Sequence, residues 1–487
     1  MKNIRIRRHD ITLSPNYERV IIRPFMPGNA AGIHRIIDRV FGLTDEAVEQ
    51  QMDSVRLDFS ERHYDIELLL QAPFAKVQHH IAAPHLLSRE RQLLIGALFA
   101  AEYSLESAAL FNPSMVLHPD QSGAPKGGLR FIISLRATGE GHISSIEFRA
   151  GTVTKNGTIQ LDPVSRYVTT PEIISDPAYH KESFILKLQQ MGFDNEQAWH
   201  VMDSLPENFS LKALNESISQ IKKRMDDPHN HDFMRALECI RWLADSNYEI
   251  CFSENLAVSE RIIFPVSANE SNGIEDARFV RFVDDDGAVT YYATYTAYNG
   301  HDILPQLICT GDFLHFRILT LNGDGVQNKG MALFPRRING RYAMLSRQDD
   351  ENVLIMFSDG PHHWSDPKVI LRPEAMWESV KIGNCGSPIE TEAGWLVLTH
   401  GVGPMRKYCI GAALLDLDDP TRVIGRLRQP LLCPEGDERE GYVPNVVYSC
   451  GSMLHGRDLI IPFAISDRAS VFSTVSLDDL LEALQTE

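Results

Sequence analysis

The second half of the sequence is a succession of short, strand-like apolar runs separated by turns rich in glycine, aspartate and asparagine. From about residue 248 onward such runs recur at short intervals, for example at 352–357, 395–399, 408–415 and 459–465. Only the tail, 477–484, has apolar residues at helical spacing. Many short strands at even spacing are typical of a sandwich, a barrel or a propeller, so we expect one of these folds.

The first half alternates between helical and strand-like patterns. With 487 residues the chain is too long for one ordinary core, and more than one unit is expected. We predict a fold that is mainly β with two helical additions, divided as follows: an N-terminal, mainly helical unit over 1–108, the first β part over 109–170, a helical insertion over 171–245, and the rest of the β domain over 246–487.

Local signals place the helices inside these units. In the N-terminal unit an extended patch covers 20–25, and the last helical pattern, with Ser88 as a candidate N-cap, extends to Ala101. In the insertion, residues 194–197 resemble a capping box, and Asp227-Pro228 breaks a helical pattern.

Composition narrows the class of protein. The formal net charge of -18 argues against a nucleic-acid partner, because phosphate backbones need a basic surface. The N-terminus has no apolar segment typical of a signal peptide, and no run of 18 apolar residues indicates a membrane span. Seven scattered cysteines without C-x-x-C spacing favour reduced thiols and a cytoplasmic protein. The pairs His79-His80 and His362-His363 cannot easily direct both rings to one ion, so we expect no metal site.

An acidic pair next to an arginine is the first candidate for chemistry. Glu275, Asp276 and Arg278 lie in the segment 271–278, and a strand-like run ending at Tyr298 follows. The pattern indicates carboxylates held at the rim of a sheet. A turn whose acids cap backbone amides and pair with Arg278 remains the alternative from the residues alone.

Four basic residues in the second half each lie at one end of a strand-like run. They are Lys329, Arg347, Lys381 and His400. Taken singly, each is explained as a solvated charge at a rim. They converge on a doubly charged anion only if the strands run radially and bring the same ends together, as in a propeller.

These stretches resemble the β-mannoside phosphorylases of glycoside hydrolase family 130. The resemblance covers about 109–165 and 248–480, and both helical units lie outside it. The matching segments are Phe111–Pro113, Gly273–Arg278, Tyr292–Tyr298, Leu333–Gly340, Trp377–Gly383, Gly411–Pro420 and Glu438–Val447.

The resemblance implies a five-bladed β-propeller and a role for each candidate residue. Asp276 inherits the role of general acid from the Glu-Asp-Pro-Arg motif of the family, whose proline is Ala277 here. Lys329, Arg347, Lys381 and His400 match the phosphate-binding positions, where lysine and histidine add charge to the grip of arginine. The residues expected to contact the sugar are Asn112, Arg136, Glu275, Arg278, Tyr298 and Asp467.

The implied reaction is inverting phosphorolysis of a β-mannoside, with inorganic phosphate as co-substrate and no cofactor. It yields α-mannose 1-phosphate and the shortened acceptor, whose identity and linkage the sequence leaves open. An inverting β-mannosidase, with Glu438 or Glu440 as base, and a non-catalytic carbohydrate-binding propeller are the alternatives. We expect a homo-oligomer, and we expect the insertion to overhang the site or to make a subunit contact.

Overall fold

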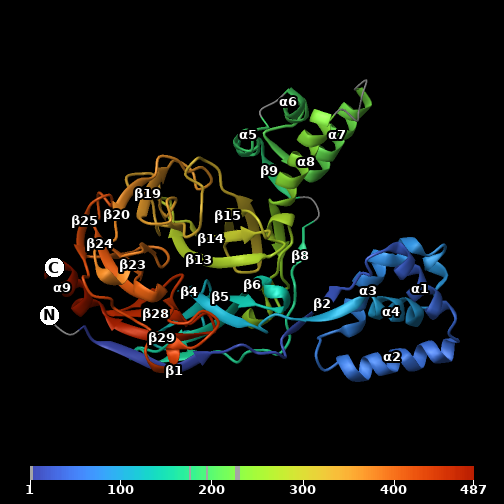
Figure 1. Ribbon diagram of the computed structural model, residues 1–487, viewed down its shortest axis with the longest axis horizontal. Helices are drawn as coiled ribbons and strands as arrows, with labels where there is room; N and C mark the ends of the chain where they lie inside the picture. Colours follow the sequence, from blue (N-terminus) through green and yellow to red (C-terminus); the bar gives the residue numbers. More distant parts are fainter. Residues whose placement is uncertain (1–3, 175–176, 194–195, 225–230, 487) are drawn as a thin grey trace.

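The β part of the protein is a set of antiparallel sheets from which two helical units project (Figure 1). The structure is a computed structural model and describes residues 4–174, 177–193, 196–224 and 231–486. The expectation of a mainly β fold with two helical additions is confirmed. None of the described helices is long and apolar enough to cross a membrane.

Four larger sheets contain most of the described strands. The first runs β1-β29-β28-β26, with β27 also on β28: β1 (Ile6–Leu13), β26 (Val447–Tyr448), β27 (Met453–His455), β28 (Asp458–Ile465) and β29 (Ala469–Ser476). Another contains β17 (Ala332–Leu333), β18 (Tyr342–Ser346), β19 (Val353–Ser358) and β20 (Lys368–Leu371). A third contains β21 (Lys381–Asn384), β22 (Ile389–Thr391), β23 (Gly394–Val402), β24 (Tyr408–Leu415) and β25 (Val423–Arg426).

The remaining sheet has 11 strands and consists of two groups. One group is β4 (Ala109–Leu117), β5 (Leu129–Thr138), β6 (Ser144–Val153), β7 (Ile159–Leu161) and β12 (Ile262–Ile263). The other is β8 (Glu172–Ile173), β11 (Tyr248–Cys251), β13 (Gly273–Val283), β14 (Val289–Tyr298), β15 (Ile303–Thr310) and β16 (His315–Thr320). A single parallel pair, Gly273 with Ser144, is the backbone pairing that joins β13 to β6, and the two groups also share an apolar core that includes Phe148 and Phe279.

The N-terminal helical unit extends from two short paired strands. It contains β2 (Val20–Pro24), α1 (Ala30–Phe41), α2 (Asp45–Phe59), α3 (Ile66–Val77), α4 (Arg89–Leu98) and β3 (Ala100–Ser104). Ser88 caps α4 as predicted, because its side chain accepts from Arg91 N. Two details differ from the sequence prediction. Ala101 lies in β3 rather than in a helix, and residues 6–13 belong to the β part, where β1 pairs with β29.

A buried ionic cluster lies where this unit joins the β part. Arg19, next to β2, contacts Glu147 of β6 at 2.7 Å and Glu106, which follows β3, at 2.8 Å. Arg149 contacts the same Glu106 at 2.7 Å. Because all four side chains are buried, removing any one would leave an unpaired charge without water. The cluster therefore attaches to β6 the two segments at which the helical unit joins the β part, next to β2 and after β3.

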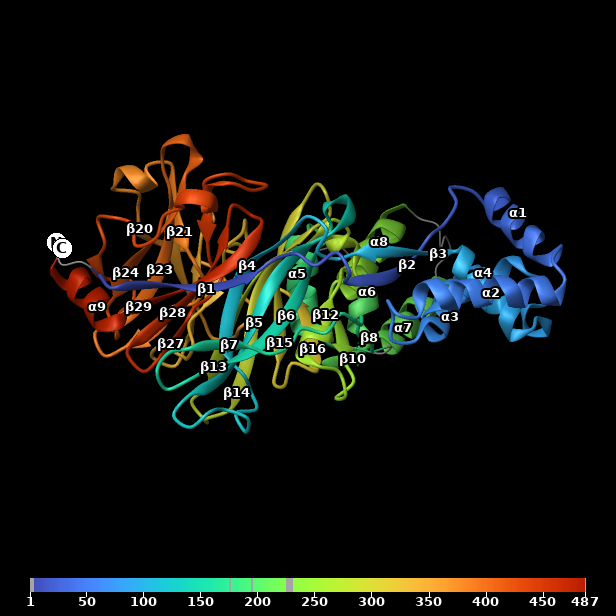
Figure 2. The same cartoon turned by 90° about the horizontal axis from the view of Figure 1, so that it is seen from below.

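The helical insertion is built around its own apolar core. It contains β9 (Ala178–His180), α5 (Lys181–Gln190), α6 (Glu196–Asp203), β10 (Asn208–Ser210), α7 (Leu211–Arg224) and α8 (His231–Asp245). The predicted capping box begins at Asp194 and Asn195, which lie outside the described residues, as does the Asp227-Pro228 break. The insertion projects near β15, and both helical units lie at the same end of the β part (Figure 1 and Figure 2).

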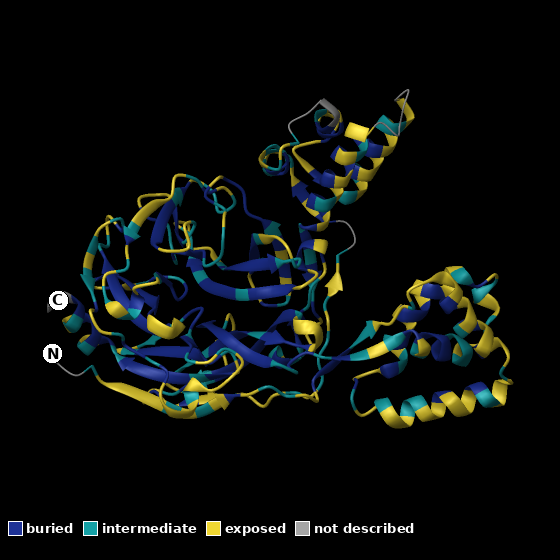
Figure 3. Ribbon diagram, in the orientation of Figure 1, coloured by how far each residue is buried: buried dark blue, intermediate teal, exposed yellow. Residues whose placement is uncertain are grey.

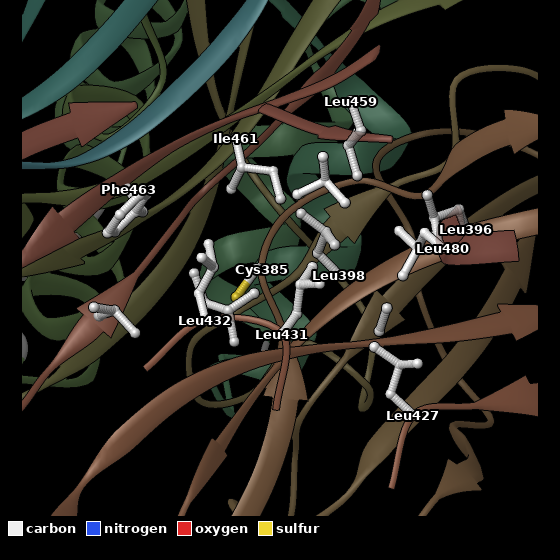
Figure 4. Close-up of a cluster of buried hydrophobic side chains, with 14 of the residues drawn as sticks. Cys385, Leu396, Leu398, Leu427, Leu431, Leu432, Leu459, Ile461, Phe463 and Leu480 are labelled. Atoms are coloured by element: carbon white, nitrogen blue, oxygen red, sulfur yellow. The ribbon is translucent and has the colours of Figure 1, made fainter. Parts of the chain in front are cut away.

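The residues of the sheets are more often buried than those of the helices. Most positions of the strands are buried, whereas long stretches of the N-terminal helices are exposed on one face (Figure 3). One apolar cluster joins β23, β28 and α9 (Leu477–Thr486), and Figure 4 shows Leu398, Ile461 and Leu480 among its members. Adjacent sheets thus share cores through their faces, and their strand ends are left free to carry polar groups.

Candidate active site

Two matching β-bulges present polar side chains from two neighbouring strands. The β4–β5 register shifts between Phe111 and Ser114, and Asn112 has a φ of 49°. The β13–β14 register shifts between Glu275 and Arg278, and Asp276 has a φ of 54°. Bulges re-aim side chains and are frequent beside active sites. Left-handed backbone at a non-glycine residue is also unusual and tolerated best by Asn and Asp.

The two bulged residues contact each other. Asn112 Nδ2 donates to Asp276 Oδ1 at 2.7 Å. Arg136 donates to the same oxygen at 3.3 Å through Nη1 and to Glu275 Oε1 at 2.8 Å through Nη2. Lys329 Nζ donates to Glu275 Oε2 at 2.5 Å. Five of the residues predicted for the site therefore form one network, and its members come from β4, β5, β13 and the segment before β17.

Charge around this network sets the protonation of its acids. Burial raises the pKa of Asp276, but Arg136, the Asn112 amide, Lys329 and Arg278 outweigh it and hold that pKa below its usual value. For Asp467, the effects that raise its pKa exceed those that lower it. Burial and the negative charge of Asp276 raise the pKa of Asp467 to about 6 against the effect of Arg136. Asp276 is thus ionised in the unliganded protein at neutral pH, and Asp467 titrates in the mildly acidic range.

A second, basic group gathers the remaining predicted cations. Arg347 Nη1 lies 3.1 Å from His400 Nε2, and Arg347 Nη2 lies 3.5 Å from Asp350 Oδ1. Lys381 Nζ contacts both oxygens of Asp350 at 3.0 and 3.1 Å. Gly383 is required beside this group, because a Cβ there would lie 2.8 Å from His400 Nε2. Arg347 follows β18, Lys381 begins β21 and His400 lies within β23, so three strands bring these residues together.

Lys329 lies on the acid side and is linked to the basic group through its neighbours. Asn328 Nδ2 donates to the Arg347 carbonyl at 2.9 Å. The four predicted cations consequently occupy one region, but they divide into Lys329 with Glu275 and the Arg347 group.

His400 corrects one expectation. Burial, reinforced by Arg347, Arg278 and Lys381, lowers the pKa of His400 far below its usual value. The ring is therefore neutral, with Nε2 accepting from Arg347, so His400 supplies hydrogen bonds and no charge to the unliganded site. The prediction that it adds positive charge is wrong for this state.

Arg278 connects the two groups. Its Nη1 donates to the Asn384 carbonyl at 2.8 Å, and its Nη2 donates to Tyr448 Oη at 2.5 Å. The Tyr448 ring lies 4.9 Å from the His400 ring, centroid to centroid. Arg278 acts on the pKa of both Asp276 and His400, so its charge is shared between the acid and the basic group.

Several buried polar atoms of the site lack a partner. They are Asn112 Oδ1, Arg347 Nε and Asn384 Oδ1. An unsatisfied buried donor or acceptor costs about 1–3 kcal/mol, and native proteins retain few of them. Asn112 belongs to the acidic network and Arg347 to the basic group, so a polar ligand bound at the site would complete these bonds.

Some site residues were not foreseen from the sequence, and some predicted ones lie apart. Tyr448, Asp350 and Asn384 are new; Asp350 follows a predicted cation within three residues, which was the available signal. Tyr298, the last residue of β14, donates to the carbonyl of Gly300, and no hydrogen bond found among the described residues joins its side chain to the network. Glu438 pairs with Arg8, so it is not presented to Asp276.

Potential metal ligands gather elsewhere. Within the described ranges, the group that could hold an ion is His180, Glu182 and Glu207, all exposed and all in the helical insertion. None of them contacts the network around Asp276. The absence of a metal from the acid and basic groups stays a prediction.

Comparison with known proteins gives the family. The family model described as β-1,4-mannooligosaccharide phosphorylase matches residues 247–486. A 1,2-β-oligomannan phosphorylase from Thermoanaerobacter sp. (strain X514) is 36% identical over 230 residues, which cover 45% of this chain and 75% of the relative. The chain belongs to glycoside hydrolase family 130.

Two further comparisons extend over more of this family 130 protein. A β-1,2-mannobiose phosphorylase from Listeria innocua serovar 6a is 29% identical over 357 residues, or 70% of this chain and 91% of the relative. The solved structure of the β-1,2-mannobiose phosphorylase from Listeria innocua with β-1,2-mannobiose has a TM-score of 0.48 and 23% identity, over 79% of this chain and 94% of that one. The resemblance inferred from the motifs is confirmed, and the chain is an enzyme of the β-mannoside phosphorylase family.

Proposed function

We propose that this enzyme catalyses inverting phosphorolysis of a β-mannoside and releases α-mannose 1-phosphate and the shortened acceptor. The observation that carries the proposal is the position of the Arg347–His400–Lys381 group beside the acidic network of Asp276, with Arg278 between them. A hydrolase needs a carboxylate to activate water, whereas a phosphorylase needs cations that orient a dianion.

We propose further that the sheets form a five-bladed propeller, with the 11-stranded sheet divided at β6 and β13. A cavity of about 320 Å³ supports this arrangement, because strands or adjoining segments of five groups line it. These groups contribute Met115 of β4, Phe279 of β13, Pro335 after β17, Ile389 of β22 and Met453 of β27. Central convergence of one segment per blade is the arrangement that brings the basic residues together.

On the acid side, the proposed mannose site is formed by Asn112, Arg136 and Asp467 around Asp276. Asn112 and Arg136 hold the Asp276 carboxylate by hydrogen bonds and fix its aim without the proline of the family motif. Asp276 is the proposed general acid, delivering its proton through the 3-hydroxyl of the mannose, as the family resemblance implies. Proton transfer of this kind contributes about 10²–10⁴-fold to rate.

On the basic side, the proposed nucleophile is a phosphate oxygen. Arg347 offers a planar pair of donors, Lys381 adds charge, and neutral His400 donates or accepts as the anion requires. Holding the phosphate in line with the anomeric carbon removes the entropic cost of bringing two reactants together. The product is then α because attack comes from the face opposite the β-linked leaving group.

Phosphate also supplies a reason for Asp276 to take up its proton. The pKa of Asp276 is low in the unliganded protein partly because Lys329 and Arg278 are positive. A dianion near these cations offsets their field, and a nearby negative charge favours the protonated carboxyl. Phosphate binding and protonation of Asp276 are thus coupled by electrostatics.

For the substrate we propose a β-1,2-linked mannoside, in view of the relatives from Thermoanaerobacter and Listeria innocua that bear this linkage in their names. The test incubates the protein with β-1,2-mannobiose, β-1,4-mannobiose and mannosyl-glucose, each with and without inorganic phosphate. ³¹P NMR should detect α-mannose 1-phosphate from the β-1,2 substrate, and the Asp276→Asn variant should form it about 10³-fold more slowly. Release of free mannose at the same rate without phosphate would instead establish a mannosidase.

A variant pair tests the basic group directly. Arg347→Ala should raise the apparent KM for phosphate about 10- to 100-fold, since charge-assisted hydrogen bonds are each worth about 1.5–3 kcal/mol. Arg341→Ala, whose exposed side chain pairs with exposed Asp359, serves as the control. Equal KM values for phosphate in the two variants would remove Arg347 from the anion site.

A further inference from the structure

Two exposed rings from different sheets meet at the rim of the site. His142 lies in the turn between β5 and β6, and Tyr442 lies in the segment that leads to β26. Their ring centroids are 5.5 Å apart, with an interplanar angle of 33°. Tyr442 is 66% exposed, and His142 is exposed as well. Two aromatic rings in contact and open to solvent offer an apolar face with polar edges, a combination that is common at binding surfaces.

The backbone on both sides of the pair is firmly held. His142 N donates to the Gly139 carbonyl and Gly139 N to the Ile143 carbonyl, each at 3.1 Å, and His142 has a φ of 61°. Val443 N donates to the Ser466 carbonyl at 3.1 Å. Gly441 packs so closely against the same carbonyl that a Cβ there would overlap it. The rings are therefore presented on ordered turns and do not depend on a loop that must first fold.

Each ring lies close in the structure to one of the two residues that flank Asp276. The β5–β6 hairpin that carries His142 also carries Arg136, whose Nε donates to Ser144 Oγ at 2.9 Å. Ser466, which anchors the Tyr442 segment, directly precedes Asp467. Arg136 and Asp467 act on each other's charge and on that of Asp276. The pair thus stands above the acid side of the site.

The pair also lies on the two strand groups that supply no cation to the basic group. Arg347, Lys381 and His400 come from the sheets of β18, β21 and β23, whereas His142 and Tyr442 belong to the β4–β6 group and the β26–β29 sheet. An inverting reaction places the leaving group on the face opposite the nucleophile. The leaving sugar therefore belongs on the side where the rings are.

We infer that His142 and Tyr442 form an aromatic platform for the acceptor pyranose, the sugar released by phosphorolysis. The inference rests on the proposed function, because it assigns a leaving-group subsite to that reaction. A pyranose presents a face of C–H groups that packs on aromatic rings, while its hydroxyls remain at the edge for the imidazole and phenol to bond. The platform takes a neutral hexopyranose, because its two rings offer an apolar face with hydrogen-bonding edges.

The test measures synthesis in the reverse direction, from α-mannose 1-phosphate and mannose as acceptor, using the full-length protein. Tyr442→Ala should raise the KM for the acceptor about tenfold, which equals about 1.4 kcal/mol, and His142→Ala should raise it less. The KM values for phosphate and for α-mannose 1-phosphate should stay within about twofold. Tyr442→Phe keeps the ring and should retain most of the affinity for the acceptor.

Tyr17→Ala is the matched control, because Tyr17 is 68% exposed and lies in the segment that precedes β2. An unchanged acceptor KM in Tyr442→Ala would overturn the inference while leaving the phosphorolysis intact. Calorimetric titration with methyl β-mannoside and mannobiose separates the two claims if turnover is absent. If turnover is absent, loss of binding in Tyr442→Ala but not in Tyr17→Ala would support the aromatic platform and contradict the proposed phosphorolysis. Absence of binding to the wild type would contradict both the platform and the phosphorolysis.

Discussion

The bulges of β4 and β13 are the same backbone device carrying different chemistry. In each, the ladder skips two residues, and the first of them has a left-handed backbone, with φ of 49° at Asn112 and 54° at Asp276. The next residue is Pro113 in β4 and Ala277 in β13, and the one after is Ser114 or Arg278. The Ser114 hydroxyl accepts a hydrogen bond from Phe279 N, whereas the Arg278 side chain donates to Tyr448 and Asn384.

The difference between the two bulges locates the function. A bulge by itself presents a polar side chain from an inner strand, and β4 uses it to hold an amide against Asp276. In β13 the same geometry presents an ionisable group, with an arginine two residues later that faces the basic group. We call Asn112 or Asp276 the first place of its bulge, Pro113 or Ala277 the second, and Ser114 or Arg278 the third. The backbone provides the position of each bulge, and the side chains at the first and third places decide whether the strand contributes catalytic groups.

Replacing Asp276 by Asn makes the first place of the β13 bulge identical to that of β4. The amide cannot donate a proton of the required acidity, so kcat should fall about 10³-fold with the fold unchanged. Steady-state phosphorolysis of β-1,2-mannobiose measures the effect. Asp359→Asn, at a carboxylate 94% exposed, is the control. Full activity of the Asp276→Asn variant would remove this residue as the acid.

Arg278→Lys tests the third place of the bulge. An ammonium cannot reproduce the two directed bonds to Asn384 and Tyr448, so kcat/KM should fall about 10- to 100-fold. The thermal midpoint should be compared with that of the wild type, because Arg278 is buried. Arg341→Lys, at an exposed position just before β18, should be neutral, and an equally neutral Arg278→Lys would contradict the assigned link between the two groups.

Asn112→Asp makes the β4 bulge resemble that of β13. It places a second carboxylate at the 2.7 Å contact, and a like charge there raises the pKa of Asp276. The group that must be protonated then stays protonated to higher pH, so the alkaline limb of the pH–rate profile should move upward. We expect a loss in kcat/KM of about tenfold at pH 7 from the altered mannose contact. Asn339→Asp, also at positive φ but exposed, should leave the profile unchanged.

Ala277→Pro tests the second place and should have the smallest effect. Pro113 follows a residue with nearly the same φ in β4, so a proline fits after Asp276 without changing its conformation. Restricting the unfolded chain should stabilise the protein by about 0.4–1 kcal/mol, with activity within about twofold. Urea unfolding measures the gain. A destabilised Ala277→Pro variant would show that the two bulges are not equivalent.

The sequence predicted most elements because their signals are local. The runs predicted at 352–357, 395–399 and 408–415 correspond to β19, β23 and β24, with β23 longer than predicted. Ser88 indicated the start of α4, because serine is a preferred N-cap residue. The prediction that the helix extends to Ala101 was wrong. The apolar spacing of α4 continues past Leu98, but pairing with β2 makes residues 100–104 a strand. The position of β1 had no local signal, since its partner β29 lies more than 450 residues away.

By itself the sequence determined which side chains are available: an aspartate in an acidic motif, four basic residues at strand ends, and the segments that identify the family. Only the tertiary structure decided that Lys329 pairs with Glu275 rather than joining Arg347, that His400 is neutral, and that Tyr448 completes the site. The physical reason is that protonation and pairing depend on burial and on charges from distant strands. Neither quantity is encoded in the neighbours of a residue along the chain.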